Sequence, residues 1–194
     1  MYEKRDYSGL IGIPGISEKS LITHLALYEG YVNNINKLND LLVEMEKAGD
    51  VQSPEFAELN RRFGWEWNGM RLHEYYFGGL TKGGKDRNSD SELDKNIVKS
   101  FGSFESWKKD FISMGMMRGI GWVILYYDKI RGELFNVWID QHDQGHLAGA
   151  SPIIALDVFE HAYMIDYGKD RAPYIDAFLN NLDWAEIEKR FIEG

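Results

Sequence analysis

Residues 157–163 read Asp-Val-Phe-Glu-His-Ala-Tyr and follow an apolar run, Ile-Ile-Ala-Leu, at 153–156. The apolar run is typical of a buried strand, which would turn into a helix within the next few residues. Asp157 and His161 are four residues apart, so a carboxylate and an imidazole can reach one point in space. Carboxylate oxygen and imidazole nitrogen together suit a first-row metal ion. On spacing alone, a helix-capping Asp beside a hydrogen-bonded core His is the simpler interpretation.

The N-terminal half of the chain predicts two long helices. Apolar residues recur at helical spacing over 18–47, and a Ser-Pro pair at 53–54 opens a second helix after a short turn. Because the connection is short, we expect an antiparallel hairpin. A glycine-rich segment of mixed charge at 78–90 is the clearest linker. We therefore expect a helical hairpin lobe at 1–85 and a second lobe at 90–194.

The second lobe mixes helices and strands, so the predicted fold class is α+β. Its strands include a hairpin closed by a turn at 128–132, and they should form a three-stranded antiparallel sheet. The expected helices are 91–100, 103–117, 173–182 and 184–192, and the expected strands are 122–127, 134–139 and 152–156.

Composition limits the classes of function. The 194 residues contain no cysteine, which excludes disulfides and thiolate metal sites and fits a reducing compartment. The net charge of -9 argues against nucleic acid as a partner, because phosphate binding needs clustered Lys and Arg. Residues 1–10 are charged and lack the apolar core of a signal peptide, and no run approaches the roughly 18 apolar residues of a membrane helix. We expect a soluble, cytoplasmic protein with no membrane partner.

The heptapeptide is part of a wider resemblance. With Arg-Ala-Pro-Tyr-Ile at 171–175 and Asn-Asn-Leu-Asp-Trp at 180–184, it resembles the C-terminal signature of the iron/manganese superoxide dismutases. Phe159 stands where that family usually has Trp. The surroundings of His24 and His73 are similar to the N-terminal pattern of the same family, so the resemblance covers essentially the whole chain. Taken alone, each of these two histidines is more simply interpreted as a buried core residue that makes a local hydrogen bond.

The resemblance implies a ligand set of His24, His73, Asp157 and His161 around one iron or manganese ion per subunit. Three neutral imidazoles and one carboxylate offset part of the metal charge and leave a position for solvent. The implied reaction is conversion of the superoxide anion to dioxygen and hydrogen peroxide by redox cycling of the metal. Either metal is compatible with the sequence.

Other interpretations can be weighed against this one. A carboxylate-bridged di-metal oxidase requires paired Glu-x-x-His motifs on helices, and the sequence contains no Glu-x-x-His. The His73-Glu74 pair lacks the second His, four residues on, that a zinc protease needs. The alternative that stays open is a non-catalytic metal-binding protein of the same fold, acting as a structural or interaction module.

The resemblance also implies groups around the metal. Tyr31 would stand at the substrate mouth. It follows His24 by seven residues where familiar members have eight, so an unbulged helix can bring both to one face.

The solvent molecule at the metal needs a hydrogen-bond partner. In the family, the side chain that bonds this solvent molecule comes from one of two positions. One position is Gly69 in this chain, which has no side chain to form the bond. The other lies in a loop, where either His142 or Gln141 fits.

Two further residues concern the surroundings of the site. Glu160 resembles an interface glutamate that contacts the ligand His of the partner subunit, which implies a homodimer, with a tetramer possible. Arg171 is the candidate for a local cation that attracts superoxide to an acidic protein. A His–Tyr pair that usually joins the subunits is missing, because its places fall on Leu27 or Tyr28 and on Met164.

Overall fold

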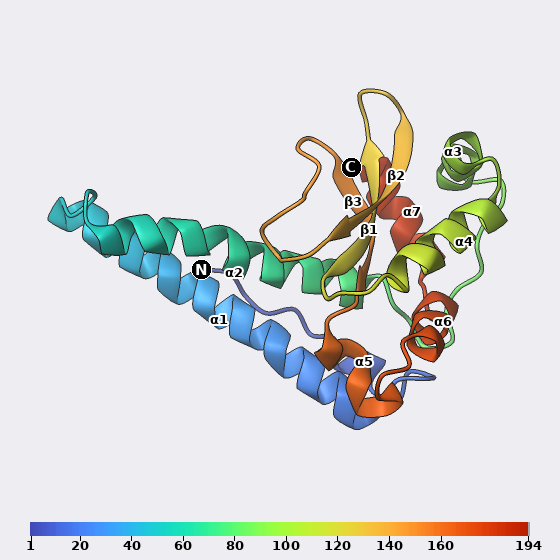
Figure 1. Ribbon diagram of the computed structural model, residues 1–194, viewed down its shortest axis with the longest axis horizontal. Helices are drawn as coiled ribbons and strands as arrows, with labels where there is room; N and C mark the ends of the chain where they lie inside the picture. The colour runs from blue at the N-terminus through green and yellow to red at the C-terminus, as the bar shows by residue number, and fades with distance from the viewer. Residues whose placement is uncertain (194) are drawn as a thin grey trace.

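The computed structural model describes residues 1–193 and begins with the expected helical hairpin (Figure 1). Helix α1 (Glu18–Ala48) starts after Ser17, whose hydroxyl accepts a hydrogen bond from the backbone of Ser20, and it ends at Gly49 with a left-handed φ of 76°. Helix α2 (Pro54–Gly78) returns antiparallel to α1. The far end of this hairpin projects away from the rest of the molecule.

The C-terminal part contains the predicted sheet and the predicted helices, with ends shifted by one or two residues. The segment before α1 contains one 3-10 turn, η1 (Ser8–Leu10). The remaining elements are α3 (Glu92–Phe101), α4 (Phe104–Gly115), β1 (Trp122–Asp128), β2 (Glu133–Ile139), β3 (Ser151–Asp157), α5 (Glu160–Tyr167), α6 (Ala172–Asn180) and α7 (Trp184–Glu193).

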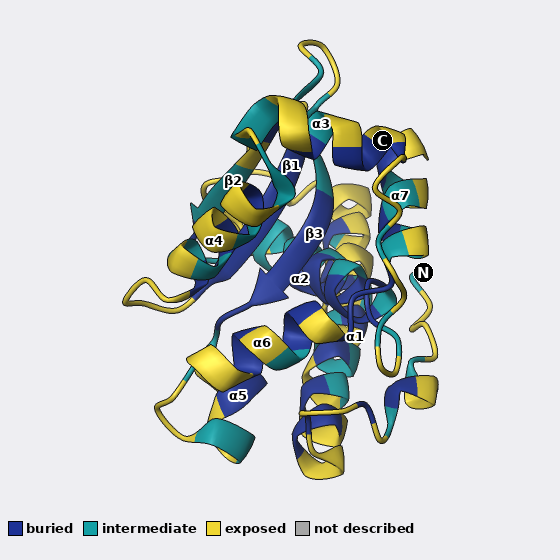
Figure 2. Cartoon of the chain, turned by 90° about the vertical axis from the view of Figure 1, so that its right-hand side faces the viewer, coloured by how far each residue is buried: buried dark blue, intermediate teal, exposed yellow. Residues whose placement is uncertain are grey.

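The sheet is antiparallel in the order β2-β1-β3, so β1 is its central strand. Trp122, the first residue of β1, pairs with Ile139 on one side and with Asp157 on the other. Gly121, just before β1, has φ 136°, and a Cβ there would lie 1.9 Å from the carbonyl oxygen of Ile139. Only glycine therefore fits this close approach. Helix α4 packs against β1 and β2, and most residues of β1 and β3 are buried, whereas most of β2 is not (Figure 2).

Two packing contacts bring the hairpin against the C-terminal part: α5 packs on α1, and β3 packs on α2. The end of β3 and the start of α5 therefore lie against the hairpin. Buried apolar residues of both parts form one continuous cluster. The division into lobes 1–85 and 90–194 stays a prediction, because the two parts share this core.

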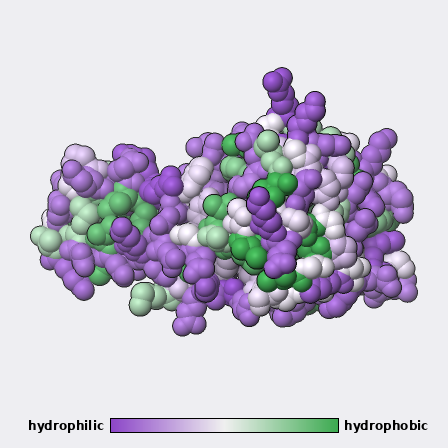
Figure 3. All heavy atoms as spheres, turned by 90° about the horizontal axis from the view of Figure 1, so that it is seen from below, coloured by the Kyte–Doolittle hydropathy of each residue, from purple (hydrophilic) through white to green (hydrophobic). Residues whose placement is uncertain are grey.

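Some apolar side chains are exposed on the surface of the molecule. Seen from below, apolar side chains gather on the body of the molecule in the region of α5 (Figure 3). The exposed apolar residues of α5 and of the turn between α4 and β1 are Met116, Met117, Ile120, Met164 and Ile165. Within residues 1–193, no helix combines the length and the apolar character needed to cross a bilayer.

Candidate metal centre

Four elements contribute one side chain each to a single cluster. His24 comes from α1, His73 from α2, Asp157 from the end of β3 and His161 from α5. One ligand atom of each lies within 4.8 Å of the others. The Nε2 atoms of His24, His161 and His73 lie 3.1, 3.2 and 3.7 Å from Oδ2 of Asp157. The structure thus brings together all four residues of the predicted ligand set.

Asp157 is held by its neighbours so that one carboxylate oxygen faces the histidines. Its Oδ1 accepts a hydrogen bond of 2.8 Å from the backbone N–H of Phe159, and its backbone carbonyl accepts one of 2.8 Å from the Tyr174 hydroxyl. Pairing with Trp122 fixes its backbone. Oδ1 therefore bonds the backbone where α5 begins, and Oδ2 is left for the three imidazoles.

His73 provides the test of whether a cation fits. Its Nδ1 donates to the backbone carbonyl of Gly69 at 2.6 Å, so the neutral ring carries a lone pair on Nε2. Within residues 1–193, this Nε2 is the one buried side-chain nitrogen or oxygen that has no hydrogen-bond partner. Leaving such an atom unpaired costs about 1–3 kcal/mol. A metal ion is the partner that suits an imidazole lone pair among three other ligands. The residues present therefore fit a bound metal.

Electrostatics favour the ligand form of His73 and Asp157. Burial, followed by the nearby His24, lowers the pKa of His73 well below its usual value, which keeps the ring neutral. Burial alone would raise the pKa of Asp157, but the adjacent His161 and His24 hold that pKa well below its usual value. Neutral imidazole and ionised carboxylate are the forms that coordinate a metal.

A second chain of contacts lies beside the four ligands and joins Trp122, His142 and Tyr31. The indole Nε1 of Trp122 donates to Nδ1 of His142 at 3.0 Å, and Nε2 of His142 lies 2.7 Å from the Tyr31 hydroxyl oxygen. Because an indole N–H can only donate, Nδ1 of His142 carries no proton. The neutral ring therefore carries its proton on Nε2 and donates it to Tyr31. The hydroxyl hydrogen of Tyr31 is left free for another acceptor.

Both titratable residues of this chain, His142 and Tyr31, are neutral near pH 7. Burial is the main cause that lowers the pKa of His142 to about 4. Burial, followed by the negative charges of Asp157 and Glu66, raises the pKa of Tyr31 to about 12. The chain thus keeps one proton on Nε2 of His142 and one on the Tyr31 oxygen.

The position of Tyr31 depends on two features of the hairpin. Helix α1 is a continuous α-helix, as the seven-residue spacing predicted, and the rings of His24 and Tyr31 lie 5.0 and 5.2 Å from that of His73. A Cβ added to Gly69 would lie 2.5 Å from the Tyr31 ring. Gly69, which has no side chain to bond the solvent molecule at the metal, therefore makes room for this ring.

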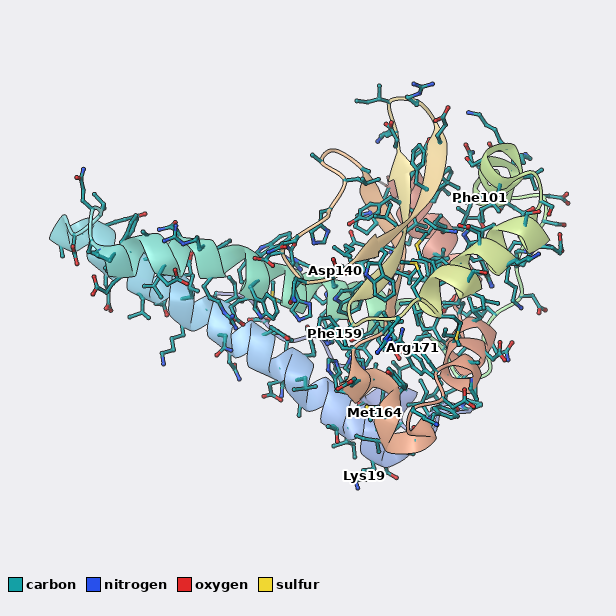
Figure 4. The ribbon with its side chains drawn as sticks, viewed as in Figure 1. Lys19, Phe101, Asp140, Phe159, Met164 and Arg171 are labelled. Atoms are coloured by element: carbon teal, nitrogen blue, oxygen red, sulfur yellow. The ribbon has the colours of Figure 1, made fainter. Side chains whose placement is uncertain are left out.

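Aromatic rings surround His142. Phe159, at the place of the usual Trp, stacks on His142 with centroids 4.9 Å apart and on His161 at 5.7 Å (Figure 4). Trp65 meets His142 edge-on at 4.7 Å. Trp65 is not among the predicted site residues, and nothing in the local sequence marks it as a neighbour of the site.

The other predicted site residues have these positions. Of the two loop candidates, His142 is the one with its side chain in the site, while Gln141 is half-buried. Glu160 is exposed at the start of α5. Arg171 donates to the hydroxyl of Tyr163 at 3.2 Å and to three backbone carbonyls, those of Gly115 at the end of α4 and of Met117 and Gly119 in the turn that follows (Figure 4). Its part in attracting superoxide stays a prediction.

The places of the missing inter-subunit pair have different occupants. Tyr28 is buried, and its hydroxyl donates to Oε1 of Glu74 at 3.1 Å. Leu27 and Met164 are partly exposed to solvent. Tyr28 therefore serves a contact within one chain.

Comparisons with known proteins agree with this geometry. A family model described as iron/manganese superoxide dismutases, C-terminal domain, matches residues 89–190. A manganese superoxide dismutase of Haloferax volcanii (number 2) is 37% identical over 179 residues, which are 92% of this chain and 88% of the relative. An iron superoxide dismutase of Cupriavidus metallidurans is 38% identical over 184 residues, 92% and 90% of the two chains. An iron superoxide dismutase of Aquifex pyrophilus is 34% identical over 194 residues, 97% and 90% of the two chains.

Proposed function

The chain belongs to the iron/manganese superoxide dismutase family, and we propose that His24, His73, Asp157 and His161 hold its metal ion. Its reaction is the conversion of superoxide to dioxygen and hydrogen peroxide, with one iron or manganese ion per subunit. The observation that supports this ligand set best is the unpartnered Nε2 of His73 facing Asp157. Relatives named for either metal support both as cofactors.

The reaction requires both a redox centre and protons. Two superoxide anions and two protons give one dioxygen and one hydrogen peroxide. A bound iron or manganese ion supplies one-electron chemistry between its divalent and trivalent states. The protein must therefore hold that ion, exclude bulk water and keep a proton donor near the substrate.

We propose that Tyr31 is this donor group at the substrate mouth. Its own hydroxyl hydrogen is not used in the contact with His142, because His142 donates from Nε2. A pKa of about 12 keeps the proton on the Tyr31 oxygen at neutral pH. His142 serves as the polar group next to the site, with Gln141 as the second candidate from the same loop. Arg171 is the proposed local cation for the anionic substrate.

The ligand set predicts the effect of four single substitutions. His24→Ala, His73→Ala, Asp157→Ala and His161→Ala should each abolish bound metal, because each removes one donor from a four-residue site. Metal content per subunit, measured by elemental analysis after purification, checks this. His142→Ala is the control, and it should keep its metal. Full metal occupancy in a ligand variant would remove that residue from the site.

The choice of metal needs its own experiment. Protein reconstituted separately with iron and with manganese should dismutate superoxide with at least one of them. Activity with both would indicate that the surroundings of the site accept either metal. Stoichiometric binding without activity for both metals would favour the non-catalytic alternative.

We further propose a homodimer in the cytoplasm. Glu160, next to the ligand His161, is exposed together with apolar side chains on α5, which supports an interface at this face. The absence of cysteine suits a reducing compartment. Sedimentation analysis should give twice the mass of one chain, and cell fractionation should recover the protein with cytoplasmic markers.

A further inference from the structure

One histidine is used neither by the ligand set nor by the chain around Tyr31. His146 lies in the irregular loop between β2 and β3, four residues after His142. Its Nε2 lies 2.7 Å from the backbone carbonyl oxygen of His142, and its Nδ1 lies 2.6 Å from the Tyr126 hydroxyl. A carbonyl oxygen only accepts, so Nε2 of His146 carries the proton. The neutral ring then accepts the Tyr126 hydroxyl hydrogen at Nδ1.

Tyr126 is a fixed anchor for this bridge. It lies on β1, the central strand, and is almost fully buried. Trp122, four residues earlier on the same strand, holds the ring of His142 through Nδ1. Strand β1 therefore holds His142 at two points, the ring through Trp122 and the backbone through Tyr126 and His146.

The loop needs such an anchor. Residues 140–150 form no helix or strand, and most of them are exposed. Within this loop, Gly145 has a left-handed φ of 85° and lies against Ile139 at the end of β2. A residue whose ring is pinned while its backbone belongs to an irregular loop can still shift, because loops are the more mobile parts of a fold.

We propose that His146 is a positioning residue that fixes the backbone of His142, and through it the contact between His142 and Tyr31. This inference rests on the proposed function of His142 beside the metal. His146 itself touches neither a ligand nor Tyr31. Only a side chain with a donor at the ε position and an acceptor at the δ position makes both contacts, and neutral His has both.

This requirement gives a matched pair of variants. His146→Gln keeps a donor at the ε position for the His142 carbonyl but has no δ acceptor for Tyr126. His146→Asn keeps a δ acceptor for Tyr126 but does not reach the His142 carbonyl. His146→Phe keeps the ring volume and removes both contacts, and Tyr126→Phe removes only the anchor hydroxyl.

The experiment uses full-length, metal-loaded protein and four readouts. These are metal content, the turnover rate for superoxide, the reduction potential of the bound metal, and hydrogen–deuterium exchange of the 140–150 loop. His146→Phe should keep full metal content, lower turnover about 10- to 100-fold, shift the potential and speed exchange of the loop. His146→Gln should recover turnover and potential better than His146→Asn, because it keeps the bond to His142.

Several outcomes would overturn the proposal. One is wild-type turnover, potential and loop exchange in His146→Phe. Another is recovery by His146→Asn and not by His146→Gln, which would assign the effect to Tyr126 alone. A third is loss of metal from His146→Phe, since a residue acting through His142 leaves the four ligands intact.

Two arrangements keep the test decisive. Should His146→Phe fail to fold, Tyr126→Phe carries the same expectation for loop exchange and turnover, and unchanged values there would overturn the proposal. Loop exchange does not depend on activity. If the wild-type protein bound metal without dismutating superoxide, the proposed function would fail while the positioning of His142 would still be measured.

Discussion

At the scale of single residues, hydrogen-bond chemistry defines the state of the site. The donor-only indole of Trp122 decides which nitrogen of His142 carries the proton, and this in turn leaves the Tyr31 hydrogen free. A buried orphan nitrogen on His73 points to a cation in the same way. Neither inference needs the ion itself, because each follows from which atoms can donate and which can accept.

The low pKa of His142 predicts a pH-dependent stability. The folded pKa is about 4 and the unfolded value about 6.5, so unfolding takes up a proton between these values. The contribution of neutral His142 to the free energy of unfolding is therefore fully present above about pH 6.5 and is lost as the pH falls toward 4. Integrated over this interval, the loss is about 3 kcal/mol.

His142→Gln should remove this part of the pH dependence while keeping an ε donor for Tyr31. Denaturant unfolding of wild type and variant at several pH values between 4 and 7 measures it. The unfolding free energy of wild type minus that of the variant should fall by about 3 kcal/mol between pH 6.5 and 4. Parallel curves across this range would show that His142 is not held neutral by burial.

At the scale of elements, the helices and strands could be predicted because their signals are local. Ser17 and Ser53 cap the two helices of the hairpin, and the apolar run before Asp157 forms β3. The choice between Gln141 and His142 could not be predicted, because tertiary contacts set the register of an irregular loop. The four-residue spacing of His142 and His146 does not fix their relative positions in such a loop. Their positions depend on Tyr126 of β1, whose hydroxyl contacts His146.

The close contact between α1 and α2 at Gly69 predicts opposite effects for two glycines of one helix. Gly69→Ala would place a Cβ 2.5 Å from the Tyr31 ring and should destabilise the protein by about 1–3 kcal/mol. Gly64→Ala is the matched control, because its Cβ would meet only the Asp143 side chain at an ordinary 3.5 Å.

Gly64→Ala should gain up to about 1 kcal/mol from helix propensity. Thermal unfolding of the metal-loaded variants compares the two. Equal stabilisation of both would mean that Tyr31 moves away from α2 without cost, and that Gly69 does not determine its place. Loss of stability in Gly69→Ala alone would support the tight packing of Tyr31 on the glycine.

At the scale of the whole molecule, the site exists only because distant parts of the chain pack together. Asp157 and His161 are neighbours in sequence, but His24 and His73 reach them through the contacts of α5 with α1 and of β3 with α2. Spacing could show only that Asp157 and His161 can reach one point in space. The full set required a resemblance to a known family, because sequence distance does not reveal which helix faces which strand.

The exposed apolar face beside the site gives the last prediction, which concerns assembly. Met164 and Ile165 on α5 lie near the turn that carries Met117, since Arg171 bonds both that turn and Tyr163 of α5. Exposed apolar groups that gather on one face are typical of protein contact surfaces. If this face joins two subunits, Met164→Glu buries a charge against its copy and should convert a dimer to a monomer at micromolar concentration.

The matched control is Ile192→Glu, which changes a more exposed apolar residue at the end of α7, outside this face. It should leave the sedimentation profile unchanged. The Met164→Glu monomer should keep its metal, because all four ligands of the set come from one chain. A Met164→Glu protein that sediments as wild type would place the subunit contact on another surface.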